Sequence, residues 1–199
     1  MPLTLRPFAI ALGVTALVLA GVSMTPYFAG DVAVARAVQA ISPGTGWAVA
    51  LTQTAVAPAK FVIMALAVAA AAALAGWKGA AVVIGALVIE QTGGEASKLI
   101  AQRPRPSPDL VAVVGRPGGF SFPSTFTTFY AVTFGALLVI AWHRPASLLR
   151  TGVMAVSALM LVLGWGARVV PGAHWPSDVL LTTLVCLTWL WATVRAARV

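Results

Sequence analysis

The stretch FVIMALAVAAAAALAG, at residues 61–76, decides the fold class of this chain. It contains no charged side chain, and its alanines from Ala69 to Ala73 suit close packing of helices in lipid, where small residues let backbones approach. A helix needs about 20 apolar residues to cross a bilayer core. The stretch can be extended back to Val56, with Lys60 reaching toward the interface, so it predicts a membrane-spanning helix.

Five other stretches of the chain are also candidates for membrane-spanning helices, and the composition agrees with them. Hydrophobic residues make up 60% of the 199 residues and charged residues only 9%, whereas a soluble domain usually carries about 25% charged residues. We therefore predict an all-α, polytopic membrane protein that forms one domain over residues 1–199. Its six membrane-spanning helices are expected at residues 8–24, 61–76, 80–99, 126–142, 148–168 and 176–193.

The segment at residues 31–41 is too short to span a bilayer. Gly30 precedes it and Ser42-Pro43-Gly44 follows it, which are signals for the start and the end of a helix. We expect this short helix to lie at the membrane interface. The segment at 8–24, after Arg6, also has the composition of a cleaved signal peptide, but the lack of a convincing small-x-small cleavage site favours an uncleaved helix.

The net charge of +8 points to anionic surroundings. The basic residues lie between apolar runs and form no dense patch, so nucleic acid is not expected as a partner. Two other roles explain the charge better. Some basic residues would flank helices on the cytoplasmic side, and others would bind an anionic ligand. The single cysteine, Cys186, excludes an intramolecular disulfide.

Three polar islands interrupt the apolar pattern. They read KLIAQRPRP at residues 98–106, FSFPSTFTT at 120–128 and RVVPGAHWPSD at 168–178. With six spans, the first two share the loop between the third and fourth helices, and the last occupies the loop between the fifth and sixth. All three then lie at one face of the membrane. Unrelated polar residues have no reason to share one side, so this coincidence predicts a site.

The charges in these islands suit phosphate. Lys98, Arg105 and Arg168 supply three positive charges, and the planar fork of arginine matches phosphate oxygens. Ser124 adds a hydroxyl where the fourth helix is expected to begin, after Pro123, and backbone N–H groups at a helix start bind anions. Each residue also has a plainer interpretation, as an interface anchor or a helix cap. Their order and shared side favour a site.

His174 is the only histidine in the three islands, and Asp178 follows it by about one helical turn. Pro176 suits the first position of a helix, which puts Asp178 in its first turn. A carboxylate bound to one ring nitrogen fixes the tautomer and leaves the other nitrogen free. That nitrogen is a candidate nucleophile, giving a phosphohistidine that water hydrolyses. The alternative is a satisfied surface pair.

These spacings resemble the signature of the type-2 phosphatidic acid phosphatase superfamily, which joins lipid phosphate phosphatases and vanadium haloperoxidases. The first part of the signature is Lys, six residues, Arg-Pro, and the third part is Ser-Arg, five residues, His, three residues, Asp. The chain matches these parts at Lys98, Arg105, Pro106, Arg168, His174 and Asp178. Ala167 stands in place of the serine, and the matching region runs from 98 to 178.

The resemblance implies a role for each matching residue. His174 would be the nucleophile and Asp178 its orienting partner. The phosphate would be held by Lys98, Arg105, Ser124, Thr125 and Arg168. Arg103 and Phe126 are secondary candidates for the same site.

The second part of the signature departs from the pattern. The family has Pro-Ser-Gly-His, and this chain has Pro123-Ser124-Thr125-Phe126. In the family this histidine protonates the leaving oxygen, which phenylalanine cannot do. Three explanations are open: a natural variant with altered chemistry, a pseudoenzyme that binds a lipid phosphate, or an engineered change at Phe126.

Leaving-group chemistry favours a particular substrate. General-acid help is worth roughly 10²–10⁴-fold when a poor leaving group must be protonated. An alcohol has a pKa near that of water, about 15.7, whereas phosphate has a second pKa of about 6. An enzyme without the acid can therefore still cleave a diphosphate. We predict an isoprenyl-diphosphate-type lipid in preference to phosphatidic acid.

Two acidic residues lie in the predicted third span. Glu90 is deep enough to be a functional suspect and either faces a lipid-access cleft or bonds to a neighbouring helix. Glu95 is closer to the interface, where an ion pair is expected. Histidines and acids form no metal-ligand cluster, so catalysis is expected without a metal or other cofactor.

The expected partners are a membrane lipid phosphate or diphosphate and the bilayer itself. If the basic residues of the islands belong to the site, the remaining basic residues place both termini in the cytoplasm and the site on the outer face of a plasma membrane, with a bacterial inner membrane fitting the size of the chain. The rival interpretation is a non-catalytic lipid-phosphate binder or a small transporter.

Overall fold

The chain is all-α over the residues that its computed structural model describes. These are residues 5–115 and 117–199, with the backbone alone described for residues 92–95. The helices are α1 (Arg6–Ser23), α2 (Asp31–Ile41), α3 (Gly46–Thr52), η1 (Gln53–Ala55), α4 (Ala59–Ala101), α5 (Thr125–Tyr130), η2 (Ala131–Gly135), α6 (Ala136–Trp142), α7 (Leu148–Val169) and α8 (Pro176–Ala197).

Five helical segments in the described part of the chain are long and apolar enough to cross a membrane. They are Arg6–Ser23, Ala59–Gln91, Thr125–Trp142, Leu148–Val169 and Pro176–Ala197. Large apolar side chains such as Leu17, Leu66 and Leu159 are more than half exposed on them. Water would penalise so much exposed apolar surface, whereas lipid does not. The chain is therefore an integral membrane protein.

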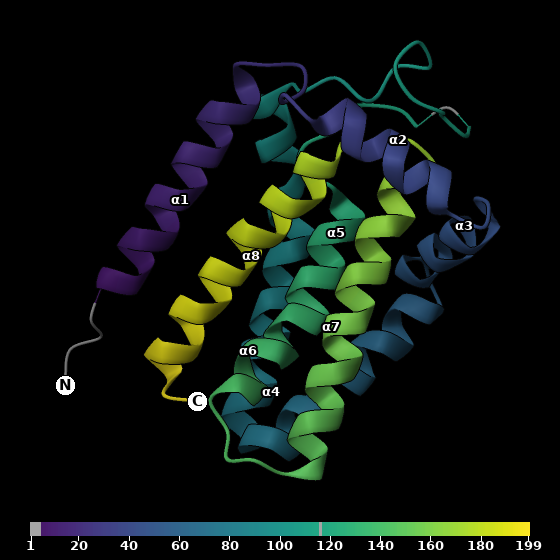
Figure 1. Cartoon of the computed structure of the whole chain (residues 1–199). Helices are drawn as coiled ribbons and strands as arrows, with labels where there is room; N and C mark the ends of the chain where they lie inside the picture. Colours follow the sequence, from purple (N-terminus) through teal and green to yellow (C-terminus); the bar gives the residue numbers. More distant parts are fainter. Residues whose placement is uncertain (1–4, 116) are drawn as a thin grey trace.

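The predicted second and third spans both fall within α4, which is sharply broken in its middle. Ala75 and Gly76 leave helical geometry, with φ of 64° at Gly76, a value that glycine adopts without strain. Lys60 Nζ lies 3.3 Å from Glu90 Oε2, although 30 residues of straight helix would separate them by about 45 Å. The two halves of α4 therefore fold back on each other (Figure 1).

The segment formed by α5, η2 and α6 runs through the middle of the bundle and is mostly buried. Tyr130 of α5 packs against α7 at Gly164, where a Cβ atom would lie 2.6 Å from Tyr130 Cδ1. Glycine at 164 thus lets the two helices approach closely. The π-helical turn η2 within this span was not predicted.

The connections place the three polar islands at one end of the bundle, as predicted. Figure 1 shows α2, the loop after α4 and the start of α8 together at one end, with the start of α1 and the C-terminus at the other. The short helix at residues 31–41 is confirmed. Helix α3 was not predicted, because its seven residues make too few turns to show a period.

Candidate functional site

His174 lies in the short loop between α7 and α8 and is 4% exposed. Its backbone N–H donates to the Arg168 carbonyl at 3.1 Å. The loop turns at Gly172, whose φ is +65° and where a Cβ atom would lie 2.1 Å from the Ala112 carbonyl oxygen. Only glycine fits this turn, so the loop packs directly on the long segment that follows α4.

The two ring nitrogens of His174 face different partners. Nε2 lies 3.1 Å from Arg105 Nη1. A guanidinium only donates, so Nε2 accepts this hydrogen bond and the ring proton is on Nδ1. Nδ1 lies 3.7 Å from Asp178 Oδ2, which is longer than a hydrogen bond but keeps the carboxylate on the proton-bearing side. This is the tautomer that a nucleophilic Nε2 requires.

The surroundings of His174 favour a neutral ring. Burial, followed by the positive charges of Arg168 and Arg105, lowers the pKa of His174 to about 4, against the opposing effect of Asp178. A buried neutral imidazole keeps its Nε2 lone pair at neutral pH. The ring can therefore act as a nucleophile or a base without first losing a proton.

Asp178 is fully buried in the first turn of α8 and is fixed on both oxygens. Oδ2 accepts from the backbone N–H of Trp175 at 2.9 Å. Oδ1 accepts from Arg103 Nη1 in a fully buried ion pair. Arg103, a secondary phosphate candidate from the sequence, therefore directs its guanidinium at a carboxylate.

Arg105 and Arg168 bring positive charge to the region of His174. Arg105 donates through Nη1 to the Ala173 carbonyl at 2.7 Å and through Nε to the Gly118 carbonyl at 2.9 Å. Arg168 donates to Thr52 Oγ1 at 3.1 Å. Burial lowers the pKa of Arg105, an effect that Asp178 partly offsets. Two guanidiniums beside a neutral imidazole are an arrangement that could bind an anion such as phosphate.

The arrangement has a counterpart among known proteins. The family model described as the PAP2 superfamily matches residues 62–198 of this chain. The chain is a member of the PAP2 superfamily. This is the superfamily of lipid phosphate phosphatases whose signature the polar islands resemble.

Among solved structures, this PAP2 chain is similar to a transmembrane PAP2-type phosphatidylglycerolphosphate phosphatase from Bacillus subtilis. The TM-score is 0.62 at 20% sequence identity, and the match covers 98% of this chain and 95% of that one. At this identity the likeness concerns the fold. No curated protein matches the chain.

The second PAP2 motif starts α5. Ser124 is buried and caps the helix, its Oγ accepting from the backbone N–H of Thr127 at 3.3 Å. Thr125 is the first residue of the helix and is exposed. The ring of Phe126 is stacked on Tyr130, with centroids 4.3 Å apart, and lies 5.5 Å from the Arg168 guanidinium. Position 126 therefore does face a residue of the candidate phosphate site.

The remaining candidates, Lys98, Glu90 and Glu95, are all residues of α4. Lys98 is half-buried in the last turn of α4. Glu90 forms an ion pair with Lys60 and also lines a groove. The sequence left open whether Glu90 faces a cleft or bonds to another helix, and the structure shows a cleft and a bond to the other half of α4. The ion pair expected for Glu95 lies outside the described residues.

Two polar residues of the site were not found by sequence reasoning. Asp31 was treated only as a helix start, yet it is 4% exposed and lies 3.1 Å from Arg103 Nη2. Thr52, the partner of Arg168, comes from the unpredicted helix α3. Their partners are far away in sequence, so no local pattern marks them.

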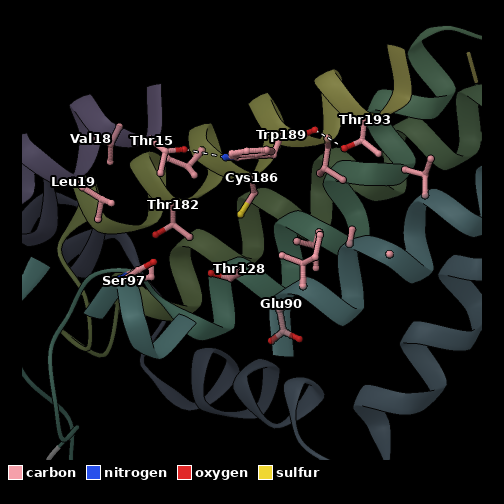
Figure 2. Close-up of a pocket in the computed structure, with 18 of the residues that line it drawn as sticks. Thr15, Val18, Leu19, Glu90, Ser97, Thr128, Thr182, Cys186, Trp189 and Thr193 are labelled. Carbon is pink, nitrogen blue, oxygen red and sulfur yellow. Dashed lines mark hydrogen bonds between the residues drawn. The ribbon is translucent and has the colours of Figure 1, made fainter. Parts of the chain in front are cut away.

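A groove of about 430 Å³ runs beside the second motif, between α1, the second half of α4, α5 and α8 (Figure 2). Its walls are mostly apolar, and Trp189 donates to Thr15 Oγ1 at 2.9 Å across it. At one end it reaches Pro123 and Thr182, and Thr182 accepts from the backbone N–H of Ser124 at 3.3 Å. The groove thus begins beside the residues of the second motif.

Proposed function

We propose that this PAP2 protein hydrolyses or transfers the phosphoryl group of a membrane lipid phosphate through a phosphohistidine at His174. The observation that carries the proposal is the setting of the ring, with Nε2 toward Arg105 at 3.1 Å and Nδ1 toward Asp178. His174 is the nucleophile and Asp178 orients it. The phosphate is held by Lys98, Arg105, Ser124, Thr125 and Arg168.

In the first step Nε2 of His174 forms a bond to phosphorus while the bond from phosphorus to the leaving oxygen breaks. The phosphate oxygens take over the donors of Arg105, which frees the Nε2 lone pair for attack. The negative charge of the transferring group is stabilised by the fixed positive charges around it. Water then attacks phosphorus and releases the ring, or another acceptor takes the phosphoryl group.

We further propose that a diphosphate lipid of the isoprenyl type is preferred. Phe126 stands where the resemblance expects the general acid, and it contacts Tyr130 and Arg168 without carrying a proton. A phosphate leaving group needs little protonation, whereas an alkoxide needs much. Without a proton donor at position 126, the cleavage rate of phosphomonoesters should therefore be lowered more than that of diphosphates.

A lipid substrate also agrees with the groove beside the second motif. On α8 the groove extends from Thr182 to Thr193, eleven residues or about 17 Å of helix. That length is similar to one leaflet of a bilayer core, about 15 Å. The apolar walls suit a hydrocarbon chain whose headgroup stays at the site end.

For the topology, we propose six crossings, with the two halves of α4 crossing separately. The fold-back at Gly76 and the contact between Lys60 and Glu90 support two antiparallel spans. Six crossings place both termini on one side and the His174 site on the other. We place both termini in the cytoplasm of a bacterium, with the site facing outward. The basic loop residues outside the site support this orientation.

The test is phosphate release by the detergent-purified protein, without added metal, from phosphatidic acid and from an isoprenyl diphosphate. We expect faster release from the diphosphate and loss of release in His174→Ala. The matched control is His143→Ala, because His143 is exposed and directly follows α6, which ends at the opposite end of the bundle from the start of α8 (Figure 1). Comparable turnover of both lipids would contradict the substrate preference, and full activity of His174→Ala would contradict the mechanism.

A second candidate function is a non-catalytic lipid-phosphate binder, which the phenylalanine at 126 favours. The two functions differ at His174. A binder should retain lipid phosphate in His174→Gln with modest loss of affinity and should release no phosphate from either lipid. A labelled phosphohistidine trapped from a radioactive diphosphate substrate would exclude the binder.

A further inference from the structure

Asp31, the first residue of α2, is a buried carboxylate with a full set of hydrogen-bond donors around it. Oδ1 accepts from the backbone N–H of Ser177 at 2.9 Å. Oδ2 accepts from Ser177 Oγ at 2.6 Å, from the backbone N–H of Phe28 at 2.8 Å and from Arg103 Nη2 at 3.1 Å. Such saturation fixes the position of the carboxylate between α2 and the start of α8.

Arg103 connects Asp31 to the catalytic pair. Its Nη2 donates to Asp31, while its Nη1 donates to Asp178 Oδ1 and, at 2.9 Å, to Ser177 Oγ. The side chain is 0% exposed and its guanidinium lies 4.8 Å from the centroid of the Phe28 ring. One buried cation is thus shared between two buried carboxylates, only one of which faces His174.

The sharing has an electrostatic consequence for His174. Without Asp31, the charge of Arg103 would be compensated by Asp178 alone, and the carboxylate facing the ring would lose most of its effect. With Asp31 present, the three groups keep a net negative charge behind Nδ1. Among the described residues, Arg105 from the loop after α4 and Arg168 from α7 also act on the ring, and both oppose a positive charge on it.

We propose that Asp31 is a positioning residue for phosphoryl transfer, holding Arg103 and Ser177 so that Asp178 can stabilise a positive charge on His174. This inference rests on the proposed function. As Nε2 forms its bond to phosphorus, the leaving oxygen departs with the bonding electrons and the ring, still protonated on Nδ1, becomes cationic. Asp31 compensates the positive charge of Arg103, which would otherwise cancel the charge of Asp178. Asp178 can therefore stabilise the cationic ring.

Kinetics of three variants test the proposal. In Asp31→Asn we expect kcat to fall by about tenfold or more, the scale of one charge-assisted hydrogen bond, while KM changes by less than about threefold. Asp31→Glu, which keeps the charge, should recover most of kcat. The matched control is Asp109→Asn, which changes an exposed carboxylate in the loop after α4. A kcat of Asp31→Asn equal to that of the wild type would overturn the proposal, as would an equal loss in Asp31→Glu.

A spectroscopic measurement tests the same coupling without activity. The chain has two histidines, so His143→Gln leaves His174 as the only one for ¹⁵N-imidazole NMR. We expect Nδ1 to be protonated, its resonance to shift when Asp31→Asn is added, and no shift with Asp109→Asn. A resonance that does not respond to Asp31→Asn would overturn the proposal.

The two measurements separate the inference from the proposed function. A wild-type protein that releases no phosphate, with a His174 resonance that responds to Asp31→Asn, would reject the function and support the coupling. An active wild type with unchanged kcat and resonance in Asp31→Asn would reject the coupling alone. If Asp31→Asn does not fold, Ser177→Ala decides: it removes hydrogen bonds to Asp31 and Arg103 and leaves every charge, so an unchanged kcat would contradict the positioning role.

Discussion

Arg105 donates a hydrogen bond from Nη1 to Nε2 of His174 at 3.1 Å, so the lone pair that would attack phosphorus already faces the cation that would hold the phosphate. The same guanidinium donates to the backbone carbonyls of Gly118 and Ala173, which fixes its plane. The proposed nucleophile and a proposed phosphate ligand are thus in direct contact.

Arg105→Lys should therefore lower kcat for the diphosphate lipid by about 10–100-fold, because an ammonium keeps the charge but not the fork that contacts backbone carbonyls and the ring together. The measurement is phosphate release at saturating lipid. Arg36→Lys is the control, since Arg36 also donates to a loop carbonyl, that of Leu110, but lies outside the site. Equal activity of Arg105→Lys and wild type would contradict the role of the fork.

The lowered pKa of His174 predicts the pH dependence of the reaction. Burial holds this pKa at about 4 instead of 6.5, so the neutral nucleophile persists well below pH 6.5 and is lost as the pH falls through about 4. We expect kcat with the diphosphate lipid to change less than about twofold between pH 7 and pH 5 through this group. If kcat is half-maximal near pH 6.5 but this midpoint is lost with a lipid whose phosphate has a lower pKa, the titrating group is the lipid phosphate. If the midpoint near pH 6.5 stays with that lipid, the prediction is contradicted.

The same shift affects stability, with a definite sign. The unfolded chain binds a proton at His174 below pH 6.5 while the folded chain does so only near pH 4, so acidification between these values favours unfolding. The thermal midpoint of wild type should therefore fall more steeply from pH 6.5 to pH 4 than that of His174→Gln. Parallel curves for the two proteins would show that His174 is not buried in neutral form.

Phe126→His tests the leaving-group argument. The new imidazole would occupy the position that contacts Arg168 and stacks on Tyr130, and it would supply the missing proton donor. We expect turnover of phosphatidic acid to rise by about 10-fold or more, part of the roughly 10²–10⁴-fold that an optimally placed general acid contributes, while diphosphate turnover changes little. Phe126→Leu, which carries no proton, is the control. A rise in both activities by the same factor would contradict the argument.

Gly172→Ala should disrupt the loop that carries His174. Its φ is +65° and its Cβ atom would lie 2.1 Å from a backbone carbonyl oxygen, so we expect a loss of about 2 kcal/mol or more of stability together with loss of activity. Gly152→Ala on α7 is the control, because nothing lies within 4 Å of its Cβ position. Thermal unfolding in detergent measures both, and equal midpoints would contradict the packing of this loop.

Because of the ion pair within α4, the losses of stability caused by replacing its two residues should not add. Lys60 and Glu90 lie 3.3 Å apart with side chains 18% and 2% exposed. Glu90→Met should destabilise the hairpin by about 3–5 kcal/mol because it leaves a largely buried cation, whereas the double variant with Lys60→Met should recover most of that loss. Thermal midpoints of the four proteins complete the cycle, and additive losses would contradict the pairing.

The sequence predicted those parts of the site that local rules control. Pro176 and Asp178 at the start of α8 and Ser124 at the start of α5 follow capping preferences, and the structure confirms both helix starts. The break after Gly76 follows from the polar interruption between two apolar runs. The residues assigned to phosphate and catalysis remain predictions.

The sequence did not reveal the contacts that depend on distant partners. Asp31 meets Arg103 and Ser177 across 72 and 146 residues of chain, and a single aspartate at a helix start is normally explained by the helix dipole. Helix α3 makes only about two turns, which gives no measurable period. Tertiary packing, which no local pattern encodes, determines these features.

The guanidinium of Arg103, shared between the starts of α2 and α8, limits how this chain can evolve. Losing Asp31 alone removes the acceptor of Arg103 Nη2 and Ser177 Oγ in a buried site, and losing Arg103 alone leaves two buried carboxylates without the cation between them. Either loss is costly in isolation, and the two losses together should cost less than their sum because the partners are in direct contact. In the natural history of this lineage, positions 31 and 103 should therefore have been retained or replaced together.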